Sequence, residues 1–252
     1  MCAETGEWLG EALTEAPWIV GYILALVGIA AGAAAQASIG MGLNLFAVPV
    51  LALIDPVYVP GPVLMHSFLL AAVASYRLRG DINVRELRIS LAGLCIGTAM
   101  AAALLLSVSS QQLPRIFGVV IVAAVAVTAA GYRVALSGRG LITASAAAGI
   151  MGTIAGVHGP PIALLYQHES PARIRSALLP FFTAANLISL LALAAIGMFG
   201  WRELVASAAL LPGLAAGYFA SPWLIRVMSP RMIRLCILAI SAVSGLLLAI
   251  RG

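Results

Sequence analysis

Two short glycine-rich breaks interrupt apolar segments of the sequence, one at residues 38–44 and the other at residues 156–161. The first backbone N–H groups of a helix have no partner within that helix, and the helix dipole places partial positive charge beside them. A helix that starts inside a membrane after such a break can therefore attract an anion. The breaks predict an anion site built from helix ends rather than from basic side chains.

The residue types in and near the breaks suit such a site. Glycine allows tight turns and close approach of a ligand to the backbone, and proline fits the first helical turn, where a missing N–H costs no hydrogen bond. Neutral polar side chains would donate hydrogen bonds to the anion. The candidate substrate-binding residues are Ser38, Gly40, Gly42, Asn44, His66, Ser67, His158, Gly159, Pro160 and Asn186.

Two histidines in this set, His66 and His158, are also the candidates for proton coupling. Histidine titrates near neutral pH, and its protonation would add positive charge to a site without arginine or lysine. A histidine inside a membrane segment is costly to bury and is often functional. For the hydroxyl and amide side chains, helix packing or hydrogen bonding to a nearby carbonyl stays open as the alternative.

Composition places these breaks in a membrane. The chain has 252 residues, of which 62% are hydrophobic and 9% are charged, too few polar residues to cover a water-soluble globule. Its apolar stretches lie at about 17–38, 43–54, 61–76, 89–107, 113–132, 140–156, 160–167, 176–198, 204–224 and 232–250.

Two of these stretches, 43–54 and 160–167, are too short to cross a hydrocarbon core of about 30 Å at about 1.5 Å per residue. Each follows one of the breaks. Each short stretch is therefore either the second arm of a re-entrant hairpin or the second half of a discontinuous spanning helix.

The order of the segments occurs twice along the chain. A shift of 118 positions lays Pro62 on Pro180, and a shift of 117 lays the Arg-Glu-Leu sequence at 85–87 on the one at 202–204. Such a match predicts an internal duplication. We predict an all-α polytopic membrane protein whose transmembrane repeats, 1–136 and 137–252, form one transport domain. Each repeat would contain a broken or re-entrant helix pair followed by three transmembrane helices.

The arginines favour the hairpin topology. All 14 basic residues are arginine, and positive residues concentrate in cytoplasmic connections. Hairpins place eleven arginines on one side against three, whereas discontinuous spanning helices divide them eight to six. The hairpin topology makes the two repeats inverted about an axis in the membrane plane, a plan common in transporters, and it puts both termini in the periplasm.

Enzyme motifs are missing from the sequence, which contains no H-E-x-x-H, no G-x-S-x-G, no P-loop and no Cys/His cluster. The acidic residues Asp55, Asp81, Glu86, Glu169 and Glu203 all lie in predicted connections. We therefore expect no enzymatic activity, no catalytic residue, no metal and no cofactor. The arginines between apolar segments are typical of topology signals, so no nucleic-acid partner is expected.

The two breaks, the duplication, the length near 250 residues and the Arg-Glu-Leu sequences resemble the sulfite exporter TauE/SafE family, also called the toluene sulfonate uptake permease family. The resemblance spans nearly the whole chain, and the family's glycine-rich turns would map onto residues 38–43 and 156–162. Ser38, Met41 and His158 stand where glycine is usual in the family. The resemblance implies export or uptake of a small anion, typically sulfite, sulfoacetate or another organosulfonate, across the inner (cytoplasmic) membrane of a bacterium, with no bound cofactor.

We therefore expect a secondary transporter, and specifically an exporter, that moves sulfite or a sulfoacetate-like organosulfonate by alternating access around a site at the membrane midplane. The expected partners are the anion, the lipid bilayer, protons and a second copy of the chain in a homodimer. Two alternatives stay open at this point: a passive anion channel, and a non-transporting subunit of a membrane assembly.

Overall fold

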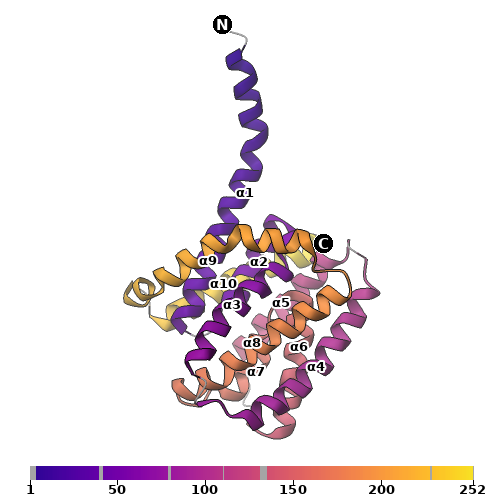
Figure 1. Cartoon of the computed structure of the whole chain (residues 1–252), viewed down its shortest axis with the longest axis vertical. Coiled ribbons are helices and arrows are strands. Elements are labelled where there is room, and N and C mark those ends of the chain that lie inside the picture. The colour runs from indigo at the N-terminus through magenta and orange to yellow at the C-terminus, as the bar shows by residue number, and fades with distance from the viewer. Residues whose placement is uncertain are drawn as a thin grey trace.

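The computed structural model describes residues 4–39, 42–78, 81–109, 111–130, 135–227 and 229–251. Within these ranges the chain is helical and contains no β-strand, which confirms the predicted all-α class (Figure 1). The helices are α1 (Glu4–Ile39), α2 (Leu43–Ile54), η1 (Pro56–Tyr58), α3 (Gly61–Arg77), α4 (Val84–Leu106), α5 (Leu113–Ala130), α6 (Gly138–Ala155), α7 (Gly159–Tyr166), α8 (Pro171–Ala195), α9 (Trp201–Val227) and α10 (Pro230–Arg251). Each apolar stretch of the sequence corresponds to one of the ten α-helices.

Six segments in the described ranges are long and apolar enough to cross a membrane, so the protein is a multi-pass membrane protein. The apolar part of α1, Trp18–Ser38, is one of them, and the part of α1 that precedes it projects from the bundle (Figure 1). Helices α2 and α7 contain 12 and 8 residues, which corresponds to about 18 and 12 Å. Neither α2 nor α7 can therefore span the bilayer alone.

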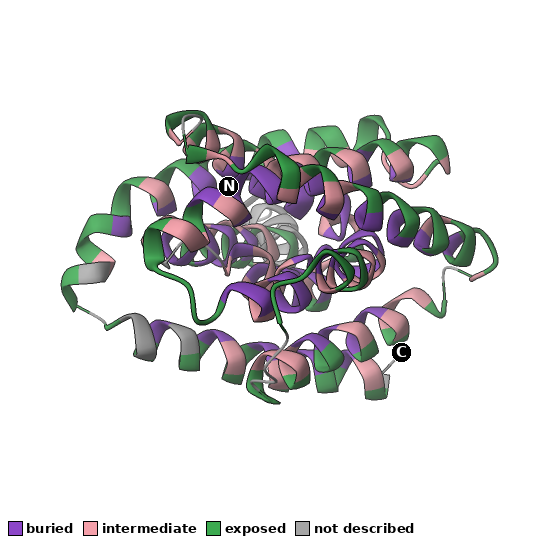
Figure 2. Cartoon of the chain, turned by 90° about the horizontal axis from the view of Figure 1, so that it is seen from below, coloured by how far each residue is buried: buried purple, intermediate pink, exposed green. Residues whose placement is uncertain are grey.

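The surface of the bundle is apolar, as contact with lipid requires. Large side chains such as Trp18, Phe219 and Trp223 are exposed on it, whereas residues of α2 and α3 such as Leu51 and Leu64 are completely buried. Figure 2 shows exposed residues on the outer sides of the peripheral helices and buried residues toward the centre. Helix α7 contains no exposed residue and α2 only Leu53, whereas α3 exposes Leu69, Val73 and Tyr76 on its outer side. The two short helices that follow the breaks therefore lie inside the bundle.

Glycines let four helices approach closely as two pairs, α4–α6 and α1–α9. The two helices of each pair run parallel, since Gly93 and Gly97 meet Ile142 and Ala146, and Gly213 and Gly217 meet Leu26 and Ala30. In the pair α4–α6, a Cβ added to Gly97 would collide with the carbonyl of Ala146. In the pair α1–α9, a Cβ added to Gly217 would collide with the carbonyl of Ala30. Small residues at such positions allow the backbones of membrane helices to pack against each other. The helices that lead into the breaks, α1 and α6, are therefore each packed tightly along one side.

Helices α5 and α10 also pack through glycine, but they run antiparallel. A Cβ on Gly118, near the start of α5, would lie 2.7 Å from the oxygen of Gly245 and 2.8 Å from Cα of Ala249, near the end of α10. A Cβ on Gly245 would lie 2.8 Å from Cγ2 of Ile121, farther along α5. Residue numbers increase along α5 while those of the contacting residues in α10 decrease, so the two helices run antiparallel.

Candidate functional site

A glycine with positive φ forms the turn at each break. Gly42, directly before α2, has a φ of 121°, and Gly156, directly after α6, has a φ of 76°. Residues with side chains rarely adopt positive φ, so glycine is needed at both turns. Gly156 also closes the end of α6, because its N–H donates to the carbonyl of Gly152 at 2.7 Å.

The two breaks, which are far apart in the sequence, meet in the folded chain. The side-chain Nδ2 of Asn44, in the first turn of α2, donates a hydrogen bond to the carbonyl of Gly156 at 2.5 Å. Because a carbonyl can only accept, the nitrogen of the Asn44 amide must face Gly156. The start of α2 is thereby joined to the turn between α6 and α7.

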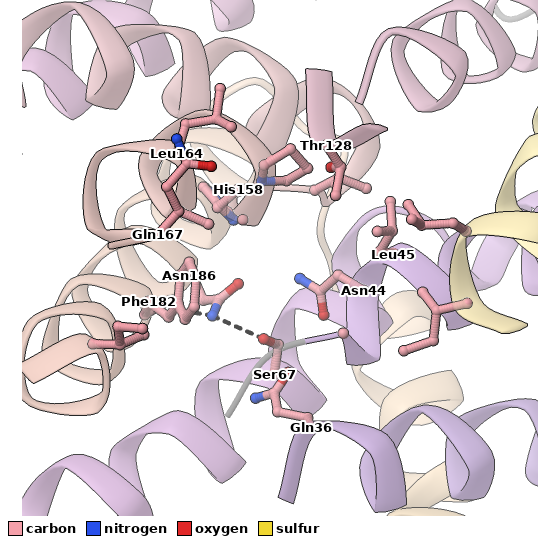
Figure 3. Close-up of a pocket in the computed structure, with 18 residues that line it drawn as sticks. Gln36, Asn44, Leu45, Ser67, Thr128, His158, Leu164, Gln167, Phe182 and Asn186 are labelled. Atoms are coloured by element: carbon pink, nitrogen blue, oxygen red, sulfur yellow. Dashed lines mark hydrogen bonds between the residues drawn. The ribbon is translucent and has the colours of Figure 1, made fainter. Parts of the chain in front are cut away.

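A cavity of about 250 Å³ lies beside this junction (Figure 3). Residues from both breaks line it, together with residues of α3, α5, α8 and α10. Its polar lining consists of Gln36, Asn44, Ser67, Thr128, His158, Gln167 and Asn186. None of the described lining residues is charged, so any ion bound there meets only dipoles and neutral side chains.

Asn186 joins the two sides of the cavity. Its Nδ2 donates to the carbonyl of Phe182 at 2.7 Å, one turn earlier in α8, and to Oγ of Ser67 in α3 at 3.1 Å (Figure 3). Asn186 is 1% exposed. The side chain is therefore fixed at the contact between α3 and α8, and its orientation is determined by the Phe182 carbonyl.

A chain of buried hydroxyl groups holds His158, the residue that precedes α7. Nε2 of His158 lies 3.0 Å from Oγ of Ser189 in α8, and that oxygen lies 2.8 Å from Oγ1 of Thr153 in α6. Thr153 in turn donates to Oγ1 of Thr98 in α4 at 3.2 Å. The ring also packs directly on Gly152, where any Cβ would collide with it. The position of His158 is thus set by three neighbouring helices.

The start of α2 leaves its helix end open for a ligand. Gly42 provides no side-chain cap, and the first turn contains no acidic residue. The first internal hydrogen bond of α2 runs from the N–H of Phe46 to Gly42, so the preceding N–H groups are without partners inside the helix. Helix α7 offers fewer such groups, because Pro160 and Pro161 occupy its first turn.

One end of the cavity lies where α5 and α7 end and α8 begins. Thr128, Gln167 and Ile174 line it there, and Gln167 is exposed. The first turns of α6 and α8, which follow these helix ends along the chain, contain Arg139 and Arg173. The described cavity therefore extends from the meeting point of the breaks toward an arginine-containing end of the bundle.

The model of the family named sulfite exporter TauE/SafE matches residues 24–248, nearly the whole chain. The chain belongs to this family. Its members are membrane transporters. Searches for similar curated proteins and for similar solved structures find no match.

In this TauE/SafE protein, most of the residues predicted to bind substrate come together at one place. The cavity lining includes Gly42, Asn44, Ser67, His158, Gly159, Pro160 and Asn186. Binding by any of them stays a prediction, but a common location is a requirement of that prediction.

Three predicted residues are not part of the described lining. Ser38 donates to the carbonyl of Ser221 in α9 at 3.3 Å. His66 is completely buried, and its Nδ1 donates to the carbonyl of Pro62 at 2.5 Å within α3. Gly40 lies outside the described residues. The positions of Ser38 and His66 fit structural hydrogen bonding, the alternative that the sequence left open.

Sequence reasoning missed two polar groups of this site. Thr128 and Gln167 lie near segment ends, where polar residues are common, so their types alone gave no signal. The second group, formed by Ser189, Thr153 and Thr98, was detectable in part. Ser189 follows Asn186 by three residues in a helix, and that spacing places both on one face.

The far end of α7 is held by a charged cluster. Arg173 in α8 and Glu86 in α4 form an ion pair with Nη2 and Oε1 at 2.5 Å, and the hydroxyl of Tyr166 donates to the other Glu86 oxygen at 3.0 Å. The Arg173 guanidinium also lies 6.0 Å from the centre of the Tyr166 ring. Glu86 therefore links the last residue of α7 to the first turn of α8.

Proposed function

We propose that this TauE/SafE protein is a secondary transporter that exports a small anion, such as sulfite or an organosulfonate, from the cytoplasm. The observation that carries the proposal is the meeting of the two breaks at one cavity, through the hydrogen bond from Asn44 to Gly156. Broken helices that meet near the midplane are a common way to build a substrate site in transporters. The family assignment supports the same function.

The anion would bind at the start of α2, where free N–H groups and the helix dipole favour negative charge. Asn44, Ser67 and Asn186 would surround it with neutral polar groups, and Gly42 and Gly159 would let it approach the backbone. The lack of charge in the described lining fits a site that must release its ligand. A basic side chain would hold the anion more strongly and slow that release.

The two halves, 1–136 and 137–252, are proposed to be inverted repeats of one transport domain. Mapping α1–α5 onto α6–α10 exchanges the tight pair α1–α9 with the tight pair α6–α4. The same mapping places α5 on α10. These two helices are antiparallel, as inversion about an axis in the membrane plane requires. Both observations support the relation between the halves.

The cavity is proposed to open toward the cytoplasm, the side from which an exporter loads its anion. Its end at Thr128 and Gln167 lies beside the first turns of α6 and α8, which contain arginine. Arginine marks the cytoplasmic side by the positive-inside rule. A cavity reached from that side would load its anion in the cytoplasm. The first residues of α1 and the last of α10 would then be periplasmic.

His158 is the proposed site of proton coupling, because it lines the cavity and three helices fix its position. Protonation of its ring would add positive charge beside the anion. His66 lies outside the described lining, so coupling there would have to act through α3. If His158→Ala in proteoliposomes leaves the pH profile of transport unchanged, coupling through this residue is excluded.

The proposed function is tested by binding and by accumulation. Purified protein is screened for thermal stabilisation by sulfite, sulfoacetate, taurine and sulfate, and proteoliposomes are then tested for uphill uptake driven by an imposed pH gradient. We expect stabilisation and accumulation for at least one sulfur anion, and a weakening of both in Asn44→Ala. Ser207→Ala is the matched control, since the Ser207 hydroxyl donates to the Glu203 carbonyl in its own helix and Ser207 does not line the described cavity.

Two results would contradict the proposal. Movement of the anion only down its gradient would indicate a passive channel. Absence of binding and movement for the whole panel would indicate a non-transporting subunit.

Side-specific labelling tests on which side of the membrane the cavity opens. Gln167→Cys, in a background in which Cys2, Cys95 and Cys236 are replaced by serine, is treated with a membrane-impermeant thiol reagent. We expect faster labelling in inside-out vesicles than in right-side-out vesicles. The opposite order would place the Gln167 end of the cavity in the periplasm.

A further inference from the structure

The unpaired polar atoms of the protein gather around the cavity. Six buried side-chain nitrogen or oxygen atoms have no hydrogen-bond partner among the described residues, and four of them belong to residues that line the cavity. These four are Nε2 of Gln36, Oδ1 of Asn44, Nδ1 of His158 and Oδ1 of Asn186. Buried polar groups in folded proteins nearly always have partners, so such a cluster points to a bound ligand or water.

Two of the unpaired atoms must be acceptors. The amide nitrogens of Asn44 and Asn186 donate to the carbonyls of Gly156 and Phe182. Since a carbonyl cannot donate, neither amide can be turned round without losing that bond. The remaining atom of each amide is therefore an oxygen. In Figure 3 the two amides face each other across the cavity.

The hydroxyl protons around His158 are few enough to count, and the count makes Nδ1 of its ring an acceptor as well. The proton of Thr153 goes to Thr98, so Ser189 must supply the proton for its bond with Thr153. Ser189 then has no proton left for His158, and Nε2 of the ring must be the donor between them. In a neutral imidazole this leaves Nδ1 with a lone pair, a third unpaired acceptor.

We infer that the site takes an anion that carries its own hydrogen-bond donor, such as a hydroxy- or amino-substituted sulfonate or a protonated sulfur oxyanion. The anionic oxygens would meet the N–H groups at the start of α2 and the free Nε2 of Gln36. The donor of the ligand would meet the unpaired oxygens of Asn44 and Asn186 and Nδ1 of His158. The inference rests on the proposed function, because it specifies the class of anion that the same site binds.

A matched pair of ligands tests whether the site prefers an anion that carries a hydrogen-bond donor. Ethanesulfonate and 2-hydroxyethanesulfonate have the same charge and nearly the same size, and they differ in one hydroxyl donor. Their dissociation constants are measured by calorimetry on the purified full-length protein. One additional hydrogen bond to an otherwise unpaired group predicts about two- to tenfold tighter binding of the hydroxy compound.

Two variants identify the acceptor, with a third as the control. Asn186→Ala removes one of the three acceptors from the cavity and should reduce the preference for the hydroxy compound. Asn44→Ala removes the facing acceptor and gives an independent measurement if the first variant does not fold. Ser207→Ala removes a hydroxyl that bonds within α9 and does not line the described cavity, so it should keep the preference.

The outcomes separate this inference from the proposed function. Equal affinity for the two sulfonates in the unmodified protein would overturn the inference and leave sulfonate binding intact; water would then satisfy the acceptors. A preference that persists in both asparagine variants would overturn the assignment of the acceptors. Binding of neither sulfonate, with no binding of sulfite, would instead reject the proposed substrate class, and the inference with it.

Discussion

Each break folds its two helices into a hairpin: a Cβ on Gly32 would contact Leu43 and one on Gly21 would contact Ile54, and a Cβ on Gly140 would contact Leu165 near the end of α7. The two hairpins differ in how polar contacts hold them. The second, α6 and α7, is held at its tip by the hydroxyl chain around His158 and at its far end by the Glu86–Arg173 ion pair. The first, α1 and α2, is linked at its tip through Asn44 to Gly156. At its far end the Tyr22 hydroxyl donates to the Ala209 carbonyl in α9, and the Asp55 carboxylate accepts from the nearby N–H of Val57.

The difference indicates separate roles for the two hairpins. The second forms a fixed wall of the cavity, because both of its ends are tied to other helices. The first brings the open helix end at Gly42 and the unpaired oxygen of Asn44. The open helix end thus belongs to the first hairpin, whose polar contacts with other helices end on backbone carbonyls, whereas side-chain pairs and an ion pair hold the second.

The largest effect is expected where the hairpins are alike. Gly97→Val would push a side chain into the Ala146 carbonyl beside the second hairpin, and Gly217→Val would do the same at Ala30 beside the first. We expect each substitution to lower the free energy of unfolding by about 3 kcal/mol or more. Denaturant titration in detergent measures this loss.

Gly138→Ala is the control for the glycine variants, because a Cβ at Gly138 meets nothing within 4 Å. Its effect should stay within about 1 kcal/mol. A tolerated Gly97→Val beside a damaging Gly217→Val would show that the two hairpins are not packed in the same way.

The hydroxyl chain of the second hairpin should give the next largest effect. Ser189→Ala removes the group between His158 and Thr153, which leaves buried polar atoms without partners. The expected loss of unfolding free energy is about 1–3 kcal/mol. Ser207→Ala, which removes only a bond within α9, should change it by less than about 0.5 kcal/mol. Equal losses in the two variants would contradict a special role for the chain.

The ends of the hairpins differ in a way that a double-mutant cycle can measure. Glu86 and Arg173 are 21% and 27% exposed, so partial screening limits their coupling to about 1 kcal/mol. Glu86→Gln, Arg173→Gln and the double variant give that coupling from thermal unfolding. Zero coupling would remove the ion pair from the contacts that fix α7.

Glu203 provides the matched control for the ion pair. It occupies the same place as Glu86 in the second Arg-Glu-Leu sequence, but its carboxylate accepts from the N–H of Gly200 at the start of its own helix. Glu203→Gln should therefore cost less than about 0.5 kcal/mol. A cost as large as that of Glu86→Gln would indicate that both hairpins are fastened alike.

The sequence was sufficient to predict the helices and the meeting of the breaks, because apolar length and glycine turns are local signals. It also contains a further repeat signal: Gly93 and Gly97 have the same spacing as Gly213 and Gly217, and both pairs pack against a helix that leads into a break. Which way a polar side chain points depends on the rotation of its helix. His66 and Ser67 are neighbours in sequence, yet only Ser67 lines the described cavity.

The hydroxyl chain and the ion pair depend on still more distant partners. Thr98, Thr153 and Ser189 come from three helices, and Glu86 and Arg173 are 87 residues apart. No periodicity within one segment brings such residues together. Their contacts follow from how α4, α6, α7 and α8 pack, which requires the three-dimensional structure.

The smallest effect is expected at Ser38, which the sequence predicted as a ligand of the anion. Its hydroxyl donates to the Ser221 carbonyl in α9 and does not line the described cavity. Loss of a partly buried hydrogen bond predicts a change in unfolding free energy of about 0.5–1 kcal/mol in Ser38→Ala and unchanged affinity for sulfite. Calorimetry on Ser38→Ala and Asn44→Ala compares the sulfite affinities of two variants in the first hairpin. A loss of affinity in Ser38→Ala as large as that in Asn44→Ala would return Ser38 to the site.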